Sequence, residues 1–285
     1  MRRRGTYLSR HKRVQRVEAK KNLAVILVIV AFAVFVFSVN AIGKFVAEKV
    51  MAPVMGSLTV VATNTPAPNA TPDTSKLTQT INVPAFSLFT IQLGAYSTED
   101  AAKTEAANVK AQGGAGYVAK GDYFRVLASG YNTKADADNV QAQLKDANKD
   151  SQVFELKCDE LVFKITATKA QIDTINNAFT KYPLLCSQFV DYSASFDKGD
   201  ISQIEFRTKI KTMLSDIQKI KTDLTNMGSS NKALLALIDI YAQAETSMED
   251  ISTDNQSSSQ DLLVKIKYNY IQMADIFCQY QSNLK

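Results

Sequence analysis

The feature of this sequence that most constrains its fold is a short pattern that occurs twice. An apolar run at 88–93 leads into 94–98 (GAYST) and then into an alanine-rich polar stretch. A second apolar run at 123–127 leads into 129–133 (SGYNT) and another alanine-rich polar stretch. An apolar run, a tight turn and helical spacing together predict a strand followed by a helix. The chain therefore contains a duplicated βα unit.

Two shorter segments complete this unit as a four-stranded sheet. A strand is expected at 117–118, joined to the strand at 123–127 by a turn rich in glycine and aspartate, and the last strand is expected at 153–156. The order βαββαβ is that of a split βαβ, ferredoxin-like sheet with both helices on one face. The other face of the sheet is then expected to be open.

Polar and aromatic side chains are expected on this open face. Gln92 would point there from the first strand, and Tyr123 and Arg125, two residues apart on the third strand, share a face by strand alternation. Tyr96 and Tyr131, which follow the two strands, complete the set of predicted glycan-binding residues. An aromatic ring stacks on a pyranose, while amide and guanidinium groups bond to its polar substituents. Taken singly, an exposed glutamine is usually solvated and a strand tyrosine usually packs.

The N-terminal part of the chain predicts a membrane anchor. Residues 1–22 form a basic tail, with nine Lys/Arg against one acidic residue in 1–21, and residues 23–43 are predominantly apolar. About 20 apolar residues are enough to cross a bilayer as a helix, and the basic flank is expected to stay cytoplasmic. The bulk of the chain would then be extracytoplasmic. A cleaved signal peptide is the alternative, but its apolar region usually has only about 7–15 residues.

The rest of the chain divides by composition. Five of the six prolines lie between residues 53 and 84, so 44–84 is expected to be a disordered linker. From residue 158 to 285 apolar residues recur at helical spacing, for example in a stripe from Ile204 to Leu224. Polar breaks in this region predict a helical domain with a bundle of three to four helices. The expected fold class is therefore α+β.

Few residues are suited to catalysis or to binding a cofactor. The only histidine is His11, in the basic tail, which excludes His-ligated zinc and Ser-His-Asp catalysis from the rest of the chain. Cys158, Cys186 and Cys278 lack metal-ligand spacing; Cys186 and Cys278 would pair if two helices aligned them, and buried free thiols are the alternative. We expect no cofactor, no metal and no enzyme, although a glycosidase that needs only two carboxylates stays open.

Nucleic acid is a rival ligand for such a sheet, because RNA-recognition domains share the topology. Residues 85–157 hold eight Lys/Arg and nine Asp/Glu, so the basic surface expected of a nucleic-acid-binding domain is lacking. The predicted location outside the cell also argues against it. We therefore expect no nucleic acid partner.

Residues 85–157 resemble the SPOR (sporulation-related repeat) domain family. The resemblance is carried by 91–96 (IQLGAY), by 121–126 (GDYFRV), and by Gly130-Tyr131 with the alanines that follow. It implies a bacterial envelope protein whose SPOR domain binds denuded glycan strands, which are peptidoglycan strands without stem peptides. Gln92, Tyr123 and Arg125 match groove positions of the family, whereas Ala95 stands where some members have a hydroxyl residue.

The sequence thus predicts a membrane-anchored peptidoglycan-binding protein that acts at sites of cell-wall remodelling, such as the division septum or a sporulation site. The helical region 158–285 would bind a protein partner in the envelope. The alternative is a SPOR-targeted cell-wall hydrolase with the helical region as its catalytic domain.

Overall fold

The computed structural model describes residues 75–284. The predicted basic tail at 1–22, the predicted transmembrane helix at 23–43 and the predicted linker as far as residue 74 lie outside this part of the chain. Within residues 75–284, no helix has the length and apolar character needed to span a bilayer.

The duplicated βα unit forms the predicted sheet. Its elements are β2 (Phe86–Tyr96), α3 (Glu99–Ala111), β3 (Tyr117–Ala119), β4 (Phe124–Tyr131), α4 (Lys134–Asp146) and β5 (Gln152–Cys158). The antiparallel strand order is β3-β4-β2-β5, which is the ferredoxin-like order expected from the sequence. Thr133 caps α4 by accepting a hydrogen bond from a backbone N–H, whereas Thr98 begins α3 without a side-chain cap.

A two-stranded ribbon flanks this sheet. It pairs β1 (Lys76–Val83) antiparallel with β6 (Leu161–Thr168), so the chain enters and leaves the sheet unit through neighbouring strands. The prediction of a disordered linker up to residue 84 is wrong for β1, and the predicted helical region begins with a strand. Ile81, Val83 and Leu161 are buried in the same core as the helices that follow, which explains why both strands are ordered.

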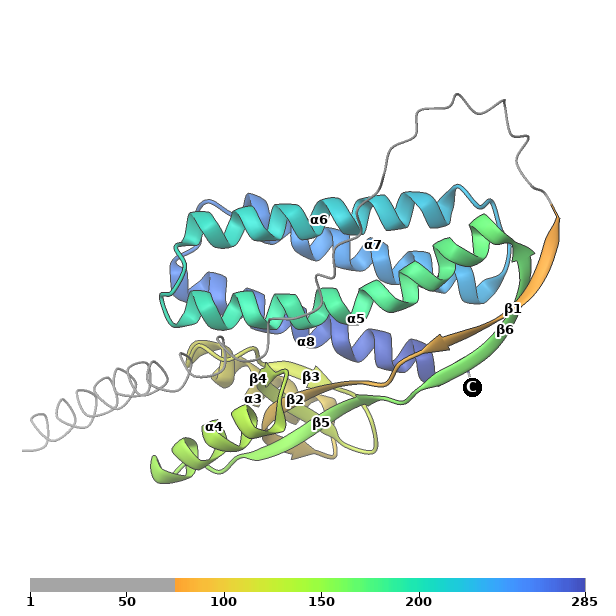
Figure 1. Cartoon of the computed structure of the whole chain (residues 1–285). Helices are drawn as coiled ribbons and strands as arrows, with labels where there is room; N and C mark the ends of the chain where they lie inside the picture. The colour runs from red at the N-terminus through yellow and green to blue at the C-terminus, as the bar shows by residue number, and fades with distance from the viewer. Residues whose placement is uncertain (1–74, 285) are drawn as a thin grey trace, which may run out of the picture. The chain divides into compact units, whose positions relative to one another are not determined.

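Four helices after β6 form the predicted bundle. They are α5 (Lys169–Asp197), α6 (Gln203–Thr225), α7 (Lys232–Thr253) and α8 (Ser259–Ser282), which lie side by side (Figure 1). Short connections between them make successive helices antiparallel. Capping boxes begin α5 at Thr168 and α6 at Ser202. The apolar stripe predicted for α6 is mostly buried, but Leu214 is half-buried and Ile204, in the first turn, is 79% exposed.

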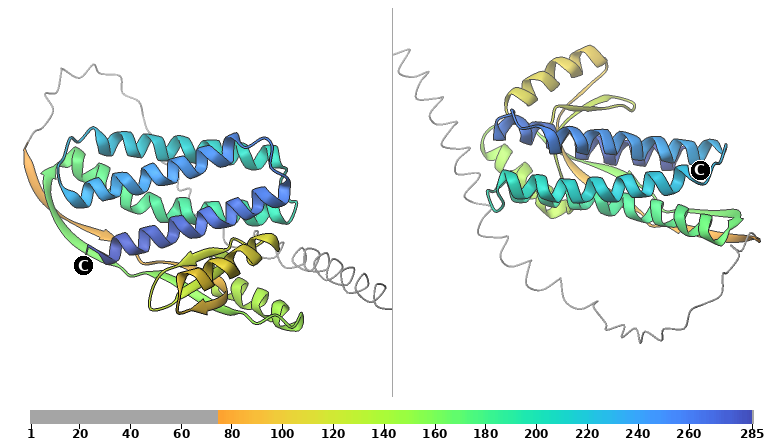
Figure 2. Two further views of the ribbon diagram at one scale, coloured as in Figure 1. Left: turned by 180° about the vertical axis from the view of Figure 1, so that it is seen from behind. Right: turned by 90° about the horizontal axis from the view of Figure 1, so that it is seen from above.

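The bundle packs on the face of the sheet that was predicted from the sequence to be open. Helices α3 and α4 cover one face, and α8 contacts the strands from the other side (Figure 2). Leu88, Leu127 and Leu156 from three neighbouring strands join the core of the bundle. A smaller core on the opposite face contains Val126 and the alanines of α3. The expectation of a fully open second face is therefore wrong, because apolar residues on that face are buried by the bundle.

One disulfide joins the sheet to the bundle. Cys158 at the end of β5 is bonded to Cys278 in α8, with 4.6 Å between the Cα atoms. Cys186 is a buried free thiol, and burial raises its pKa. A pairing of Cys186 with Cys278 is therefore wrong, because Cys158 lies on the sheet face against which α8 packs. The alternative of a buried free thiol is confirmed for Cys186 alone.

A buried hydrogen bond also joins the two parts. Tyr117 Oη donates to Asp275 Oδ2 at 2.7 Å, and burial, followed by the Asp275 carboxylate, raises the pKa of the tyrosine.

We expect Tyr117→Phe to lower the free energy of unfolding by about 2 kcal/mol, because the carboxylate loses a donor where water has little access. Denaturant unfolding measures this loss. Tyr192→Phe, at a half-buried position on α5, is the control and should change stability by less than about 0.5 kcal/mol. Equal stability of the two variants would contradict the role given to the bond.

Candidate functional site

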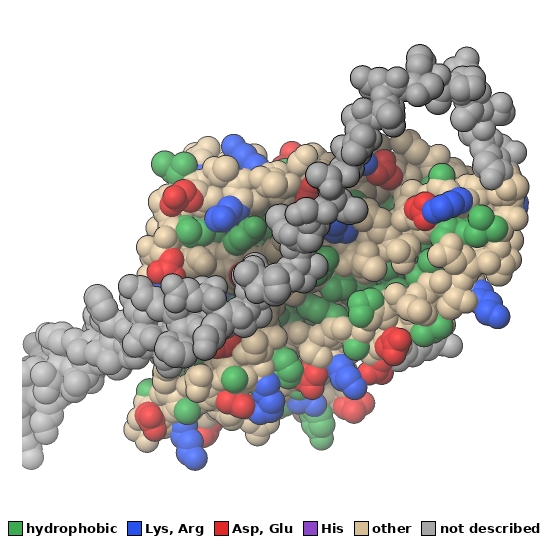
Figure 3. All heavy atoms as spheres, viewed as in Figure 1, with side chains coloured by type: hydrophobic (Ala, Val, Ile, Leu, Met, Phe, Trp, Pro, Cys, Tyr) green, Lys and Arg blue, Asp and Glu red, His purple; other side chains and the backbone are tan. Residues whose placement is uncertain are grey.

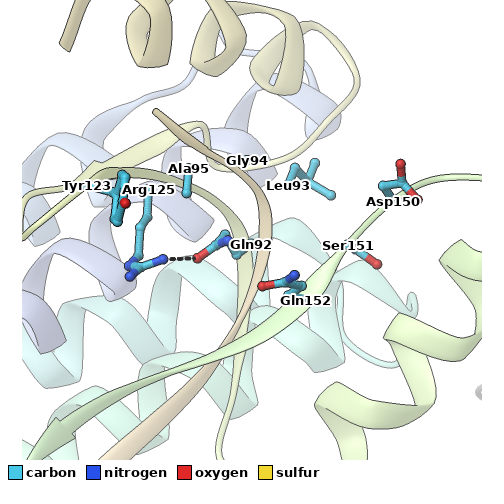
Figure 4. A pocket seen from close by; sticks show the side chains of 9 residues that line it. All are labelled: Gln92, Leu93, Gly94, Ala95, Tyr123, Arg125, Asp150, Ser151 and Gln152. Atoms are coloured by element: carbon cyan, nitrogen blue, oxygen red, sulfur yellow. Dashed lines mark hydrogen bonds between the residues drawn. The ribbon is translucent and has the colours of Figure 1, made fainter. Parts of the chain in front are cut away.

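A groove lies at the end of the sheet, on the part of the second face that α8 leaves uncovered. It crosses β4, β2 and β5 and encloses about 510 Å³ (Figure 4). Its lining consists of Gln92, Leu93, Gly94, Ala95, Tyr123, Arg125, Asp150, Ser151 and Gln152. The groove therefore brings together residues from the two halves of the duplicated unit.

Arg125 makes several contacts at the β4 side of this groove. Its Nη1 donates to Gln92 Oε1 at 3.0 Å (Figure 4). The guanidinium carbon lies 4.7 Å from the ring centre of Phe154. The ring of Tyr123 is 5.9 Å from the same carbon. Because the guanidinium is a planar group with five N–H donors, contacts that fix its plane also aim its remaining donors.

Gln92, which accepts this hydrogen bond, is almost completely buried beside the arginine. It is only 6% exposed, and two register shifts between β2 and β4 lie on either side of it. A β-bulge of this kind re-aims a side chain at the edge of a site. Two residues later, a Cβ on Gly94 would lie 2.6 Å from the ring of Tyr96, so a larger residue at this position would require the ring to move. The local backbone thus fixes the amide that accepts from Arg125.

The side of the groove formed by β5 was not predicted. Gln152 is the register partner of Gln92, and Ser151 and Asp150 precede it. The Ser151 carbonyl accepts from Gln141 Nε2 at 2.9 Å, which ties this loop to α4. The sequence did hold a signal: in a split βαβ sheet the last strand pairs with the first, so the residue before Val153 lies beside Gln92.

Two predicted site residues lie elsewhere. Tyr96 packs against the core formed with α3, where burial and then the charge of Glu105 raise its pKa. Tyr131 is at the opposite end of β4, where burial raises its pKa to about 12 and Ser129 Oγ donates to its hydroxyl at 3.3 Å. Of the five predicted residues, the groove therefore contains Gln92, Tyr123 and Arg125.

The groove offers groups that can recognise a ligand. Residues 75–284 contain no histidine and no cluster of His, Cys, Asp and Glu side chains placed to hold a metal ion. On the face shown in Figure 3, acidic and basic side chains are interspersed over both the sheet unit and the bundle. An amide, a guanidinium and an exposed aromatic ring on one surface are suited to a polar ligand that has an apolar face.

Comparison with known families identifies the sheet unit. Residues 85–155 match the family model of the SPOR domain. The chain contains a SPOR domain. No curated protein and no solved structure matches this chain. SPOR domains are binding domains for peptidoglycan, and the groove lies within this SPOR domain, whereas β1, β6 and the bundle lie outside the match.

Proposed function

We propose that this chain is a membrane-anchored, non-enzymatic peptidoglycan-binding protein whose SPOR domain holds denuded glycan strands in the groove. The observation that carries the proposal is the convergence of Gln92, Tyr123 and Arg125 in one groove of a SPOR domain. Tyr123 is 51% exposed, so its ring is available to stack on a sugar. The guanidinium of Arg125 beside it, oriented by its hydrogen bond to the buried Gln92, has further N–H donors for hydroxyl and acetamido oxygens.

The charge of Arg125 supports a preference for denuded strands. When an amidase removes a stem peptide, the amide bond to the lactyl group is cleaved and a carboxylate remains on the glycan. Arg125 is the cation among the residues that line the groove, and guanidinium–carboxylate hydrogen bonds are among the stronger ones in proteins. Intact strands have an amide at the same position, so they lack this charge.

Two features support a location outside the cytoplasm. Disulfides form and persist in oxidising compartments, and the Cys158–Cys278 bond joins the SPOR domain to the bundle. The apolar stretch at 23–43 with its basic flank would hold the chain in the membrane with its N-terminus cytoplasmic. Under this proposal the bundle is free to contact an envelope protein. A fluorescent fusion that accumulates at septa or around forespores would support a role in wall remodelling.

Binding to sacculi tests the proposal. We expect the full chain in mild detergent to be retained more strongly by amidase-treated sacculi than by intact ones. Tyr123→Ala should weaken this retention about fivefold to tenfold, because exposed aromatic anchors commonly contribute more than 1 kcal/mol to binding. Ile204→Ala, which removes an exposed apolar side chain from the bundle, is the matched control and should bind normally.

Two outcomes would contradict the proposal. Equal retention on treated and intact sacculi would remove the preference for denuded glycan. Cleared peptidoglycan in a zymogram with the full chain, lost in a variant of the bundle, would favour the hydrolase alternative instead.

A further inference from the structure

The bundle divides the ligand-binding face of the SPOR domain into a covered and an open part. Leu88 and Leu127 are 0% exposed and Leu156 is 6% exposed, although all three lie on the same face as Gln92. Thr90, between Leu88 and Gln92 on β2, is also 0% exposed. The covered part of this face therefore has no surface to offer a ligand.

Helix α8, which covers this part of the face, is attached to the sheet at three separate places. The Tyr270 hydroxyl in α8 accepts from the backbone N–H of Gly130 at 2.9 Å, and Asp275 accepts from Tyr117 at 2.7 Å. The disulfide between Cys158 and Cys278 fixes the same helix to the edge strand. Both hydrogen bonds are buried, so lifting α8 would expose unsatisfied polar groups together with the leucines beneath. Helix α8 is therefore a fixed wall rather than a lid.

The open part is short. It begins at Gln152, the exposed register partner of the buried Gln92, and reaches Tyr123 and Asp150, which are also exposed. Its width is that of three adjacent strands, with β2 between β4 and β5. Because neighbouring strands lie about 4.8 Å apart, the outer two are about 10 Å apart, roughly the length of one disaccharide unit.

We propose that this SPOR domain contacts only a short stretch of glycan, about one or two disaccharide units by the strand spacing, and that α8 sets this limit. The inference rests on the proposed function and specifies its ligand. Sugars beyond the groove would extend into solvent, or meet the side of α8, without burying further sheet surface. Affinity depends on desolvated contacts that exceed the entropic cost of binding, so additional sugars contribute little.

Calorimetric titration of the full chain with soluble, peptide-free glycan fragments tests the length limit. The probes are the di-, tetra-, hexa- and octasaccharides. Each Kd is corrected statistically for the number of positions along the probe at which the groove could bind. We expect the affinity to rise up to the tetrasaccharide and then to change by less than about threefold up to the octasaccharide. Gln152→Ala should weaken the binding of every probe, whereas Gln188→Ala, on the exposed side of α5, should weaken none.

The outcomes separate this inference from the proposed function. An affinity that still rises about tenfold from the tetrasaccharide to the octasaccharide would overturn the length limit and leave glycan binding intact. Failure of every probe, together with failure to bind sacculi, would overturn the proposed function itself. Hydrogen exchange gives a second readout: the amides of 266–280 should exchange at the same rate with and without octasaccharide. Faster exchange would mean that α8 lifts, which would also overturn the inference.

Discussion

Removing the disulfide by a Cys158→Ala, Cys278→Ala double substitution is expected to lower the free energy of unfolding by about 4–5 kcal/mol. The bond closes a loop across a sequence separation of 120 residues, and the conformational entropy that such a cross-link removes from the unfolded chain grows with loop length. A typical domain has only about 5–15 kcal/mol of total stability, so the loss would be a large fraction of it. Denaturant unfolding with and without a thiol reductant measures the effect.

The reductant supplies the control. It should destabilise the wild-type chain by about as much as the double substitution does, and it should leave the double variant unchanged. Cys186→Ala tests for a general effect of losing a buried sulfur, and the reductant should still destabilise this variant. A wild-type unfolding midpoint that does not respond to reductant would show that the disulfide does not stabilise the fold.

Arg125→Ala is expected to weaken binding to amidase-treated sacculi by about thirtyfold. Hydrogen bonds to charged groups contribute about 1.5–3 kcal/mol, and each 1.4 kcal/mol is tenfold in Kd. The substitution also leaves Gln92 without the donor that orients it. Arg125→Lys should bind with intermediate affinity, because an ammonium keeps the charge but cannot bond to Gln92 and to a carboxylate in one plane.

Two measurements separate a binding effect from a folding effect. Lys145→Ala removes an exposed cation from α4, outside the groove, and should leave retention unchanged. The melting temperature of Arg125→Ala should stay within a few degrees of the wild type, because the loss of one half-buried contact costs about 1 kcal/mol or less. A folded Arg125→Ala variant that is retained like the wild type would show that the groove does not bind the glycan.

Local pattern was sufficient to predict the sheet unit and three of the residues that line the groove. Alternation in β2 and β4 placed Gln92, Tyr123 and Arg125 on one face, and the structure brings them into one groove. Strand alternation could not place Tyr96 and Tyr131, because both lie where a strand ends and the backbone turns. The Ser151 and Gln152 side of the groove depends on how β5 pairs with β2, which is a non-local contact.

The packing of α8 on the second face of the sheet was not predicted, although the sequence of the strands contains a signal for it. Leu88 alternates with Phe89, and Leu127 with Val126, so both faces of these strands are apolar at the same level. Strands with two apolar faces are typical of a sheet that is buried on both sides. The pairing of β1 with β6 was harder to predict, because β1 has few apolar residues and its paired residues are 78 to 92 positions away in the sequence.

The ribbon of β1 and β6 determines how the chain carries mechanical load. The backbone runs from Lys76 through β1 directly into β2, and β2 contains Gln92 in the groove. Tension between the segment that precedes Lys76 and a ligand held in the groove would therefore pass along nearly continuous extended backbone. The hydrogen bonds between β2 and β4 would share that load side by side, as in shear, and would not open one at a time. Because Ile81 and Val83 of β1 are buried in the core of the bundle, displacing β1 along this path would also disturb the packing of the helices.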